Sequence, residues 1–147
     1  MPVIHAKDIE EGRRSFGQWR DAALEQLEQV SGTSDTALAP ADIRLRISPR
    51  LTRRTWAMAV RYTLHLLQQK APGPGVEVRV APWGAVKILD GPASDPHNLT
   101  PPDVIELEPA VWLRAAAGIT TWDEERDAGH VAAVGERDDL SALLPLR

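Results

Sequence analysis

Hydrophobic side chains recur at helical spacing in the first part of the chain. Between residues 9 and 30 the larger apolar positions fall three or four residues apart, from Phe16 through Trp19 to Leu27. This spacing places them on one face of a helix of about 20 residues. The small and polar residues at 31–34 end that helix, and a loop leads to Pro40.

A second amphipathic helix is predicted over residues 49–70. Its large apolar residues, from Trp56 to Leu67, repeat at spacings of four, four and three. Ser48 and Pro49 supply an N-cap and a first-turn proline. The prolines and glycines at 71–75 cannot continue a helix, so they end it.

Five short segments have the apolar pattern of strands. In the first, 43–47, isoleucine and leucine alternate with arginine, which favours a strand and leaves a helical turn as the alternative. Segments 76–80 and 86–88 alternate in the same way across a turn and predict a hairpin. Segments 104–107 and 131–134 complete a predicted set of about five strands.

The second half of the chain also carries helix signals. A helix is predicted over 109–117, opened by a proline and closed by a glycine. Thr121 and Glu124 match a capping box, which predicts a helix as far as Ala128. A last short helix is expected at 140–144, and 91–102, with four prolines, is expected to be a loop.

Composition indicates one folded domain in a reducing compartment. The chain has 147 residues, of which 43% are hydrophobic and 26% charged, as in ordinary globular proteins. It has no cysteine, which excludes disulfides, zinc–thiolate sites and thiol nucleophiles. The longest stretches without a charged residue have eight residues, so no stable membrane insertion is expected. The first residues do not resemble a signal peptide, and a cytoplasmic location is expected.

Charge is unevenly distributed along the chain. The net charge is −4, but residues 1–75 carry 11 basic and 8 acidic side chains, and residues 76–147 carry 6 and 13. Six arginines lie between Arg44 and Arg61, and such a cluster can bind nucleic acid or an anionic membrane. Because the whole chain is acidic, we interpret the cluster as a solvated face and expect no nucleic-acid partner.

The residue types of common catalytic sites do not converge in the sequence. The four histidines are scattered, so no metal site is expected. The carboxylates at 123–127 crowd a helix start, and helix capping explains them. The sequence lacks the glycine-rich phosphate loop, the hydrolase nucleophile elbow and the dinucleotide fingerprint. We therefore expect no catalytic residue and no cofactor.

A series of short motifs follows in order over residues 50–146. They are Ala71-Pro72-Gly73, Val76 to Val80, Ala81-Pro82-Trp83-Gly84, Thr100-Pro101-Pro102, Glu108-Pro109, Trp112-Leu113, Gly118, Trp122, Gly129-His130, Gly135 and Leu144-Pro145-Leu146. Together they resemble the small bacterial branch of the sterol carrier protein family. Where many relatives carry a basic, glycine-containing loop, this chain has Ala93 to Leu99.

The resemblance implies an α+β fold, with a curved, mostly antiparallel sheet backed by helices. It implies a sterol-carrier-like domain over 49–147. Residues 1–48 lie outside the resemblance, and we expect their helix and strand to pack on that domain as an extension, where they extend the sheet or cover a face. It also implies that an apolar tunnel binds a fatty acyl or sterol-like molecule without catalysis. Metal-dependent bacterial isomerases that carry a similar domain bind their metal in a separate helical domain, whose ligand pattern is absent here.

On this fold the tunnel is expected between the helices at 56–67 and 112–116 and the hairpin at 76–88. The predicted wall residues are Trp56, Val60, Leu64, Val78, Trp83, Val86, Ile88, Trp112, Ala116, Leu140 and Leu144. Two alternatives stay open. The chain can be an interaction module or homodimer whose tunnel is filled by tryptophans, or the accessory subunit of an enzyme.

Overall fold

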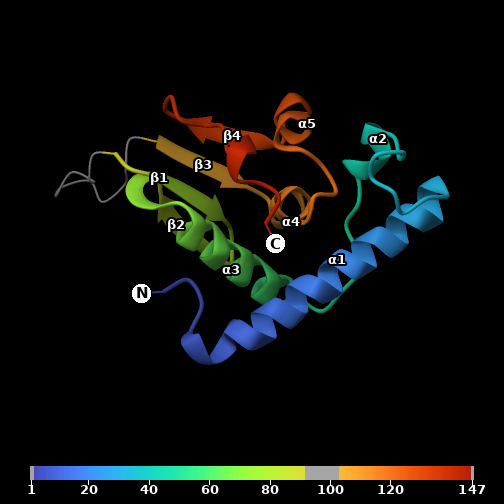
Figure 1. Cartoon of the computed structure of the whole chain (residues 1–147), viewed down its shortest axis with the longest axis horizontal. Helices are drawn as coiled ribbons and strands as arrows, with labels where there is room; N and C mark the ends of the chain where they lie inside the picture. The colour runs from blue at the N-terminus through green and yellow to red at the C-terminus, as the bar shows by residue number, and fades with distance from the viewer. Residues whose placement is uncertain (1, 92–102, 147) are drawn as a thin grey trace.

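A computed structural model describes residues 2–91 and 103–146 of the chain. Helices lie against one face of a four-stranded sheet (Figure 1). The elements in chain order are η1 (Ala6–Asp8), α1 (Ile9–Ser31), α2 (Ala41–Arg44), α3 (Arg53–Lys70), β1 (Pro72–Val80), β2 (Gly84–Ile88), β3 (Asp103–Leu107), α4 (Pro109–Ala117), α5 (Trp122–Asp127), β4 (Val131–Val134) and η2 (Ser141–Leu143). The predicted α+β class is confirmed, with four strands in the described residues rather than about five.

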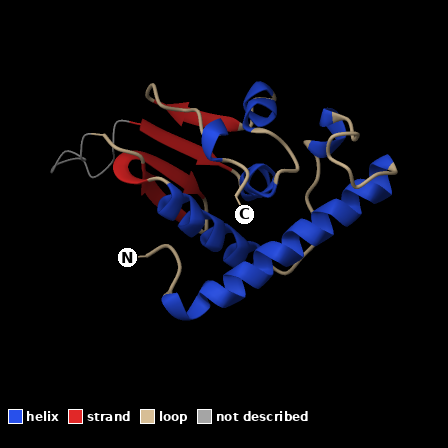
Figure 2. Cartoon of the chain, in the orientation of Figure 1, coloured by secondary structure: helices blue, strands red, loops and turns tan. Residues whose placement is uncertain are grey.

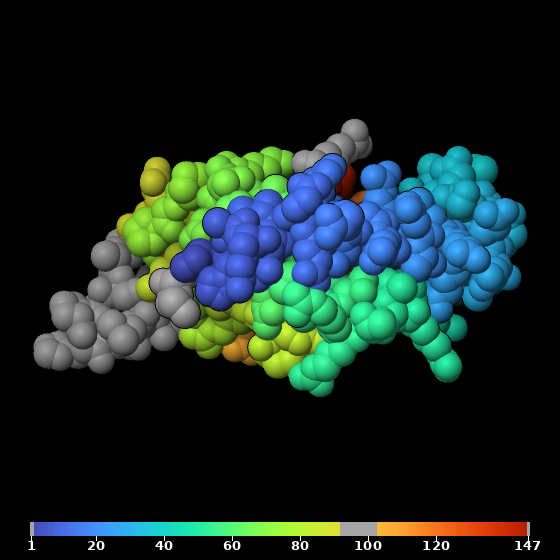
Figure 3. Space-filling view, turned by 90° about the horizontal axis from the view of Figure 1, so that it is seen from below, coloured from blue at the N-terminus to red at the C-terminus, as the bar shows by residue number. Residues whose placement is uncertain are grey.

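Helix α1 confirms the first predicted helix almost to the residue. It ends at Gly32, whose left-handed φ of 82° lets its N–H donate to the carbonyl of Glu28. Its apolar stripe packs on α3, and the indoles of Trp19 and Trp56 meet edge to face at 5.6 Å. Figure 3 shows α1 forming much of one face of the molecule.

The strand predicted at 43–47 is wrong. The chain forms the short helix α2 there, and the N–H of Leu45 donates to the carbonyl of Ala41 over 2.9 Å. Pro40 opens this turn. Of the three aliphatic residues in the segment only Ile47 is buried, so alternation in the sequence did not reflect alternation of two sheet faces.

Helix α3 begins at Arg53, four residues later than predicted. Its N-cap is Thr52, whose hydroxyl accepts the N–H of Thr55. Ser48 lies four residues before this cap, and its N–H donates to the side-chain oxygen of Gln26 on α1, at 2.8 Å. Residues 48–52 are therefore not part of the helix.

The sheet has the strand order β2-β1-β3-β4 (Figure 2). The β1–β2 and β3–β4 pairs are antiparallel and the central β1–β3 pair is parallel. Val76, Val78 and Val80 alternate toward the helices, as the sequence predicted, while β1 starts earlier, at Pro72, with an irregularity before Val76. Most of the predicted loop at 91–102, including Ala93 to Leu99, lies outside the described residues.

Other signals of the second half are also confirmed. Thr121 and Glu124 form both hydrogen bonds of the capping box at the start of α5. Helix α4 ends at Gly118 in a left-handed conformation. The short helix expected at 140–144 is the single 3-10 turn η2.

An ion pair ties α2 to α5. The guanidinium of Arg44 donates to both carboxylate oxygens of Glu124, at 2.6 and 2.7 Å. These hydrogen bonds, opposed by desolvation, lower the pKa of Glu124 from 4.5 to about 2. A lowered pKa in the folded state means that the pair stabilises the fold above pH 4.5 and that this contribution is lost as the pH falls toward 2.

We therefore expect Glu124→Gln to lower the free energy of unfolding by about 1–2 kcal/mol at pH 7. The difference from the unmodified protein should shrink steadily between pH 4.5 and about 2, because Glu124 binds a proton in the unfolded state there while it stays ionised in the folded state. Urea unfolding at a series of pH values measures it. Glu25→Gln, on the exposed surface of α1, is the control and should change stability little. A deficit that stays constant down to pH 2 would contradict the assignment.

Candidate functional site

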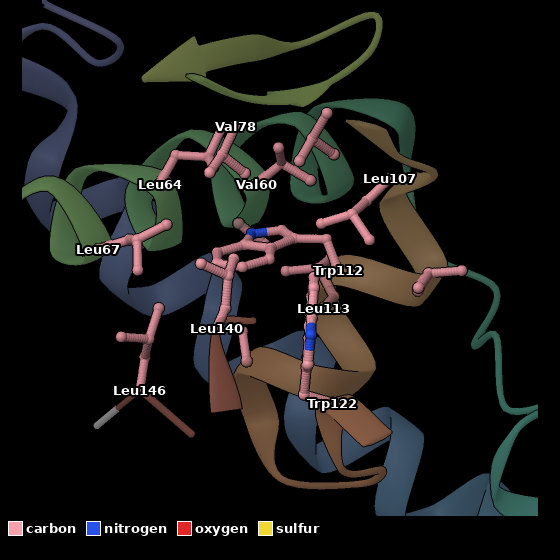
Figure 4. Close-up of a cluster of buried hydrophobic side chains, with 14 of the residues drawn as sticks. Val60, Leu64, Leu67, Val78, Leu107, Trp112, Leu113, Trp122, Leu140 and Leu146 are labelled. Carbon is pink, nitrogen blue, oxygen red and sulfur yellow. The ribbon is translucent and has the colours of Figure 1, made fainter. Parts of the chain in front are cut away.

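The predicted tunnel walls meet in the hydrophobic core. Val60, Leu64, Val78, Ile88, Trp112 and Ala116 are fully buried, and Val86 and Leu140 nearly so. Figure 4 shows the Trp112 ring in the middle of this cluster, between α3 and the C-terminal residues. The Trp112 indole N–H donates to the hydroxyl of Thr63 over 2.8 Å, which fixes the ring. The role of these residues as a ligand wall stays a prediction.

Three predicted wall residues lie at the margin of the core. Trp56 and Trp83 are half-buried and line an open groove of about 480 Å³ together with Leu51. Leu144 is half-buried and lines a different pocket, of about 340 Å³, beside Trp122. The structure therefore brings eight of the predicted residues into one cluster and leaves three around it.

Residues 138–146, which we name the C-terminal cover, close one side of the core. Leu140 and Leu146 enter the cluster with exposed fractions of 1% and 5%. Few polar contacts hold the cover to the helices. The N–H of Leu146 donates to the carbonyl of Ala116 at 2.8 Å, the indole N–H of Trp122 donates to the carbonyl of Asp138 at 3.1 Å, and the ammonium of Lys70 donates to the carbonyl of Leu143 at 2.8 Å.

Two pockets undercut the C-terminal cover from opposite sides. One, of about 330 Å³, lies toward α1, and the other, of about 340 Å³, lies toward α5. Gly118 and Pro145 line both pockets. The cover thus touches α4 at Pro145 and is hollowed on both sides of that contact.

A further pocket, which we name the sheet-edge pocket, lies where β1 and β3 end. It has a volume of about 450 Å³. Its lining residues are Arg79, Ala81, Glu106, Leu107, Glu108, Val111, Gly129, His130 and Ala132. Apolar side chains form most of its wall, and His130 brings an imidazole to it.

A buried ion pair lies behind this pocket. The guanidinium of Arg114 donates from two nitrogens to the carboxylate of Glu125, at 2.8 and 3.0 Å, and both side chains are almost inaccessible. Arg114 also donates to the carbonyl of Ile47, at 3.0 Å. The hydroxyl of Thr120 donates to Glu125 at 2.8 Å, so every charge in the pair has partners.

His130 is attached to the same carboxylate. Its Nδ1 lies 2.7 Å from Oε1 of Glu125. Helix α5 ends before Gly129, whose φ is 80°, and the N–H of His130 returns to the carbonyl of Glu125 at 3.0 Å. Both the backbone and the ring of His130 are therefore fixed by one glutamate.

The sequence analysis missed this network. It assigned Glu125 to helix capping together with its neighbours, whereas only Glu124 belongs to the capping box. The signal was Arg114, a lone charge in the apolar run 111–117. An arginine on the buried face of a helix requires a buried acceptor, and the nearby acidic helix was the place to look for it.

The arginines of the basic cluster largely have partners within the protein. Besides Arg44, Arg54 pairs with Glu11 on α1 at 2.5 Å. Arg61 donates to the carbonyl of Trp83 at 3.1 Å, and Arg53 lies 5.9 Å above the Trp83 ring. These contacts favour the interpretation that the arginines form a solvated face whose charge is balanced by groups of the same chain. The expected absence of a nucleic-acid partner stays a prediction.

Comparison with known protein families matches residues 52–146 to the family described as bacterial SCP ortholog, where SCP stands for sterol carrier protein. The match covers well over half of the chain, so the chain belongs to this family and the resemblance seen in the sequence is confirmed. The family suggests a lipid-carrying role in general and a fold that is generally not catalytic. No curated protein matches the chain. Within the described residues, no helix combines the length and apolar character needed to span a bilayer.

Proposed function

We propose that the protein binds and carries a hydrophobic small molecule, a fatty acyl or sterol-like lipid, in the cytoplasm and without catalysis. The ligand lies between α3, α4 and the sheet, where it displaces the C-terminal cover from the core. The wall is the cluster around Trp112, and Leu140 and Leu144 close one end of it in the ligand-free protein. Membership of the sterol carrier family supports the ligand class.

The observation that carries this proposal is the C-terminal cover. It buries Leu140 and Leu146 but includes only one turn of regular structure, η2. Segments with few hydrogen bonds open at lower free energy than helices or strands, so the cover is the cheapest part of the core to displace. The two pockets beside Pro145 lower that cost further, because part of its surface lies against no side chain.

Apolar burial is sufficient to retain such a ligand. A lipid that replaces the leucines of the cover regains about 25 cal/mol for each Å² of apolar surface removed from water. One or two polar groups then orient its head. No metal, cofactor or nucleophile is required by this mechanism.

Native mass spectrometry of freshly purified protein tests the proposal first. An adduct of a few hundred daltons that disappears on denaturation, identified after solvent extraction, would support a carrier and name its cargo. A second candidate function, a homodimer or interaction module, is favoured by the buried indoles of Trp19, Trp112 and Trp122, which occupy the interior. A dimer peak with no adduct would support that candidate instead.

A variant of the cover gives a sharper test. Leu140→Ala removes a buried side chain of the cover, so a fluorescent fatty acid should bind faster, by about fivefold to tenfold if opening becomes easier by about 1–1.4 kcal/mol. Stopped-flow fluorescence measures the rate. Leu38→Ala makes the same change at a side chain that is 73% exposed and should leave the rate unchanged. Equal rates in all three proteins would reject the cover as the entrance.

A further inference from the structure

The sheet-edge pocket has a feature that interior lipid binding does not explain. His130 is held at its wall by a buried glutamate, and the buried ion pair does not need it. Glu125 already accepts two hydrogen bonds from Arg114 and one from Thr120. His130 adds a fourth, from a ring that is itself 36% exposed. The main effect of this hydrogen bond is therefore to fix the orientation of the imidazole, because the carboxylate already has three hydrogen-bond donors without it.

The carboxylate determines which ring nitrogen carries the proton. Glu125 faces the guanidinium of Arg114 and accepts hydrogen bonds only. Its neighbour Nδ1 of His130 must therefore donate, which leaves Nε2 of the neutral ring as an acceptor. A hydrogen-bond acceptor fixed in orientation at the wall of a pocket is suited to a ligand that donates.

The other groups around the pocket set the charge of that ligand. Arg79 donates to Glu106 over 3.3 Å and pairs with Glu77, so its charge is already matched. Glu108, at the start of α4, adds a further negative charge to the lining. The carboxylates outnumber the guanidinium, and an anionic ligand is disfavoured there.

The remaining wall is hydrocarbon. Its apolar lining residues are Ala81, Leu107, Val111 and Ala132, of which Leu107 and Val111 are buried. A volume of about 450 Å³ falls in the range of small-molecule sites. We propose that the sheet-edge pocket binds a neutral apolar alcohol or phenol, whose hydroxyl donates to Nε2 of His130 while its hydrocarbon part lies on Leu107 and Val111. This inference does not rest on the interior lipid site.

The test uses two ligands of the same shape, 2-naphthol and 2-methylnaphthalene, of which only the first donates a hydrogen bond. Binding is measured by NMR titration at pH 8, where histidine side chains are ordinarily neutral. His130→Phe keeps a ring but removes the acceptor. We expect it to weaken naphthol binding about tenfold and methylnaphthalene binding little, as the loss of one hydrogen bond requires.

Matched variants locate the effect. His65→Phe makes the same change on α3, outside the pocket lining, and should leave both affinities unchanged. Leu140→Ala acts on the C-terminal cover and should leave the naphthol preference unchanged, which separates this pocket from the interior site. Equal losses for both ligands in His130→Phe would overturn the proposal.

A spectroscopic measurement on the unmodified protein does not depend on any variant folding. Long-range ¹H–¹⁵N correlation spectra distinguish the two imidazole tautomers. His130 should carry its proton on Nδ1, and naphthol should shift the Nε2 signal. A proton on Nε2, or no shift at saturating naphthol, would also overturn the proposal.

Discussion

Replacing Arg114 by methionine is expected to lower the free energy of unfolding by about 3–5 kcal/mol, because Glu125 is then left buried without its cation. Methionine fills most of the volume of the arginine stem, so the cost arises from the uncompensated charge rather than from a cavity. The carbonyl of Ile47 loses its donor as well. Urea unfolding followed by circular dichroism measures the loss.

Two further variants separate charge from packing. Arg114→Met combined with Glu125→Met should recover more than half of the loss, since replacing both partners of a buried pair is far milder than removing one. Arg13→Met removes an arginine from an exposed pair with Glu10 and should change stability by less than about 1 kcal/mol. A double variant as unstable as Arg114→Met would show that packing, and not charge, dominates.

Trp112→Ala is expected to lower the free energy of unfolding by about 3–5 kcal/mol and, in the same variant, to create a binding site. The indole occupies the middle of the cluster, so its removal leaves a cavity between α3 and the C-terminal cover. If lipid binds there, a saturating fatty acid should restore part of the lost stability, because a ligand that binds only the folded state stabilises it. Thermal unfolding with and without the fatty acid measures both effects.

The control is the same substitution, tryptophan to alanine, at a position outside the core. Trp83→Ala removes a half-buried indole at the turn between β1 and β2, where the cost should be about 1 kcal/mol and the fatty acid should rescue nothing. Rescue of both variants to the same extent would indicate binding outside the interior. A Trp112→Ala protein that is destabilised but not rescued would count against the interior site and leave the sheet-edge pocket untouched.

The helices and strands were predictable where the sequence pattern is compatible with only one type of secondary structure. The stripe of α1 extends over six turns, and the capping box of α5 requires a threonine and a glutamate at a fixed spacing. Residues 43–47 are too few to distinguish the helical period of 3.6 residues from the strand period of 2. Packing in the folded protein favours a turn of helix there. Helix α3 starts after Thr52, whose hydroxyl caps it, and Ser48 carries the same local signal four residues earlier, so sequence alone did not decide between the two.

The site was less predictable because its groups come from distant segments. Glu125 was identifiable as a carboxylate at a helix start, but its burial follows from the packing of α5 against α4. The position of His130 depends on that burial. The predicted wall residues around Trp112 were placed from the fold that the resemblance implies, and their burial cannot distinguish the lining of a tunnel from a filled core.

Ile47 and Trp19 lie outside the segment that matches the family, and both contact side chains inside it. The family match begins at residue 52, yet α1 covers α3 and the carbonyl of Ile47 completes the buried guanidinium of Arg114. A fragment that begins at residue 52 would expose the apolar side of Trp56 and leave one donor of Arg114 without its acceptor. The matched segment 52–146 therefore depends on residues before it for part of its buried surface and for one of its buried hydrogen bonds.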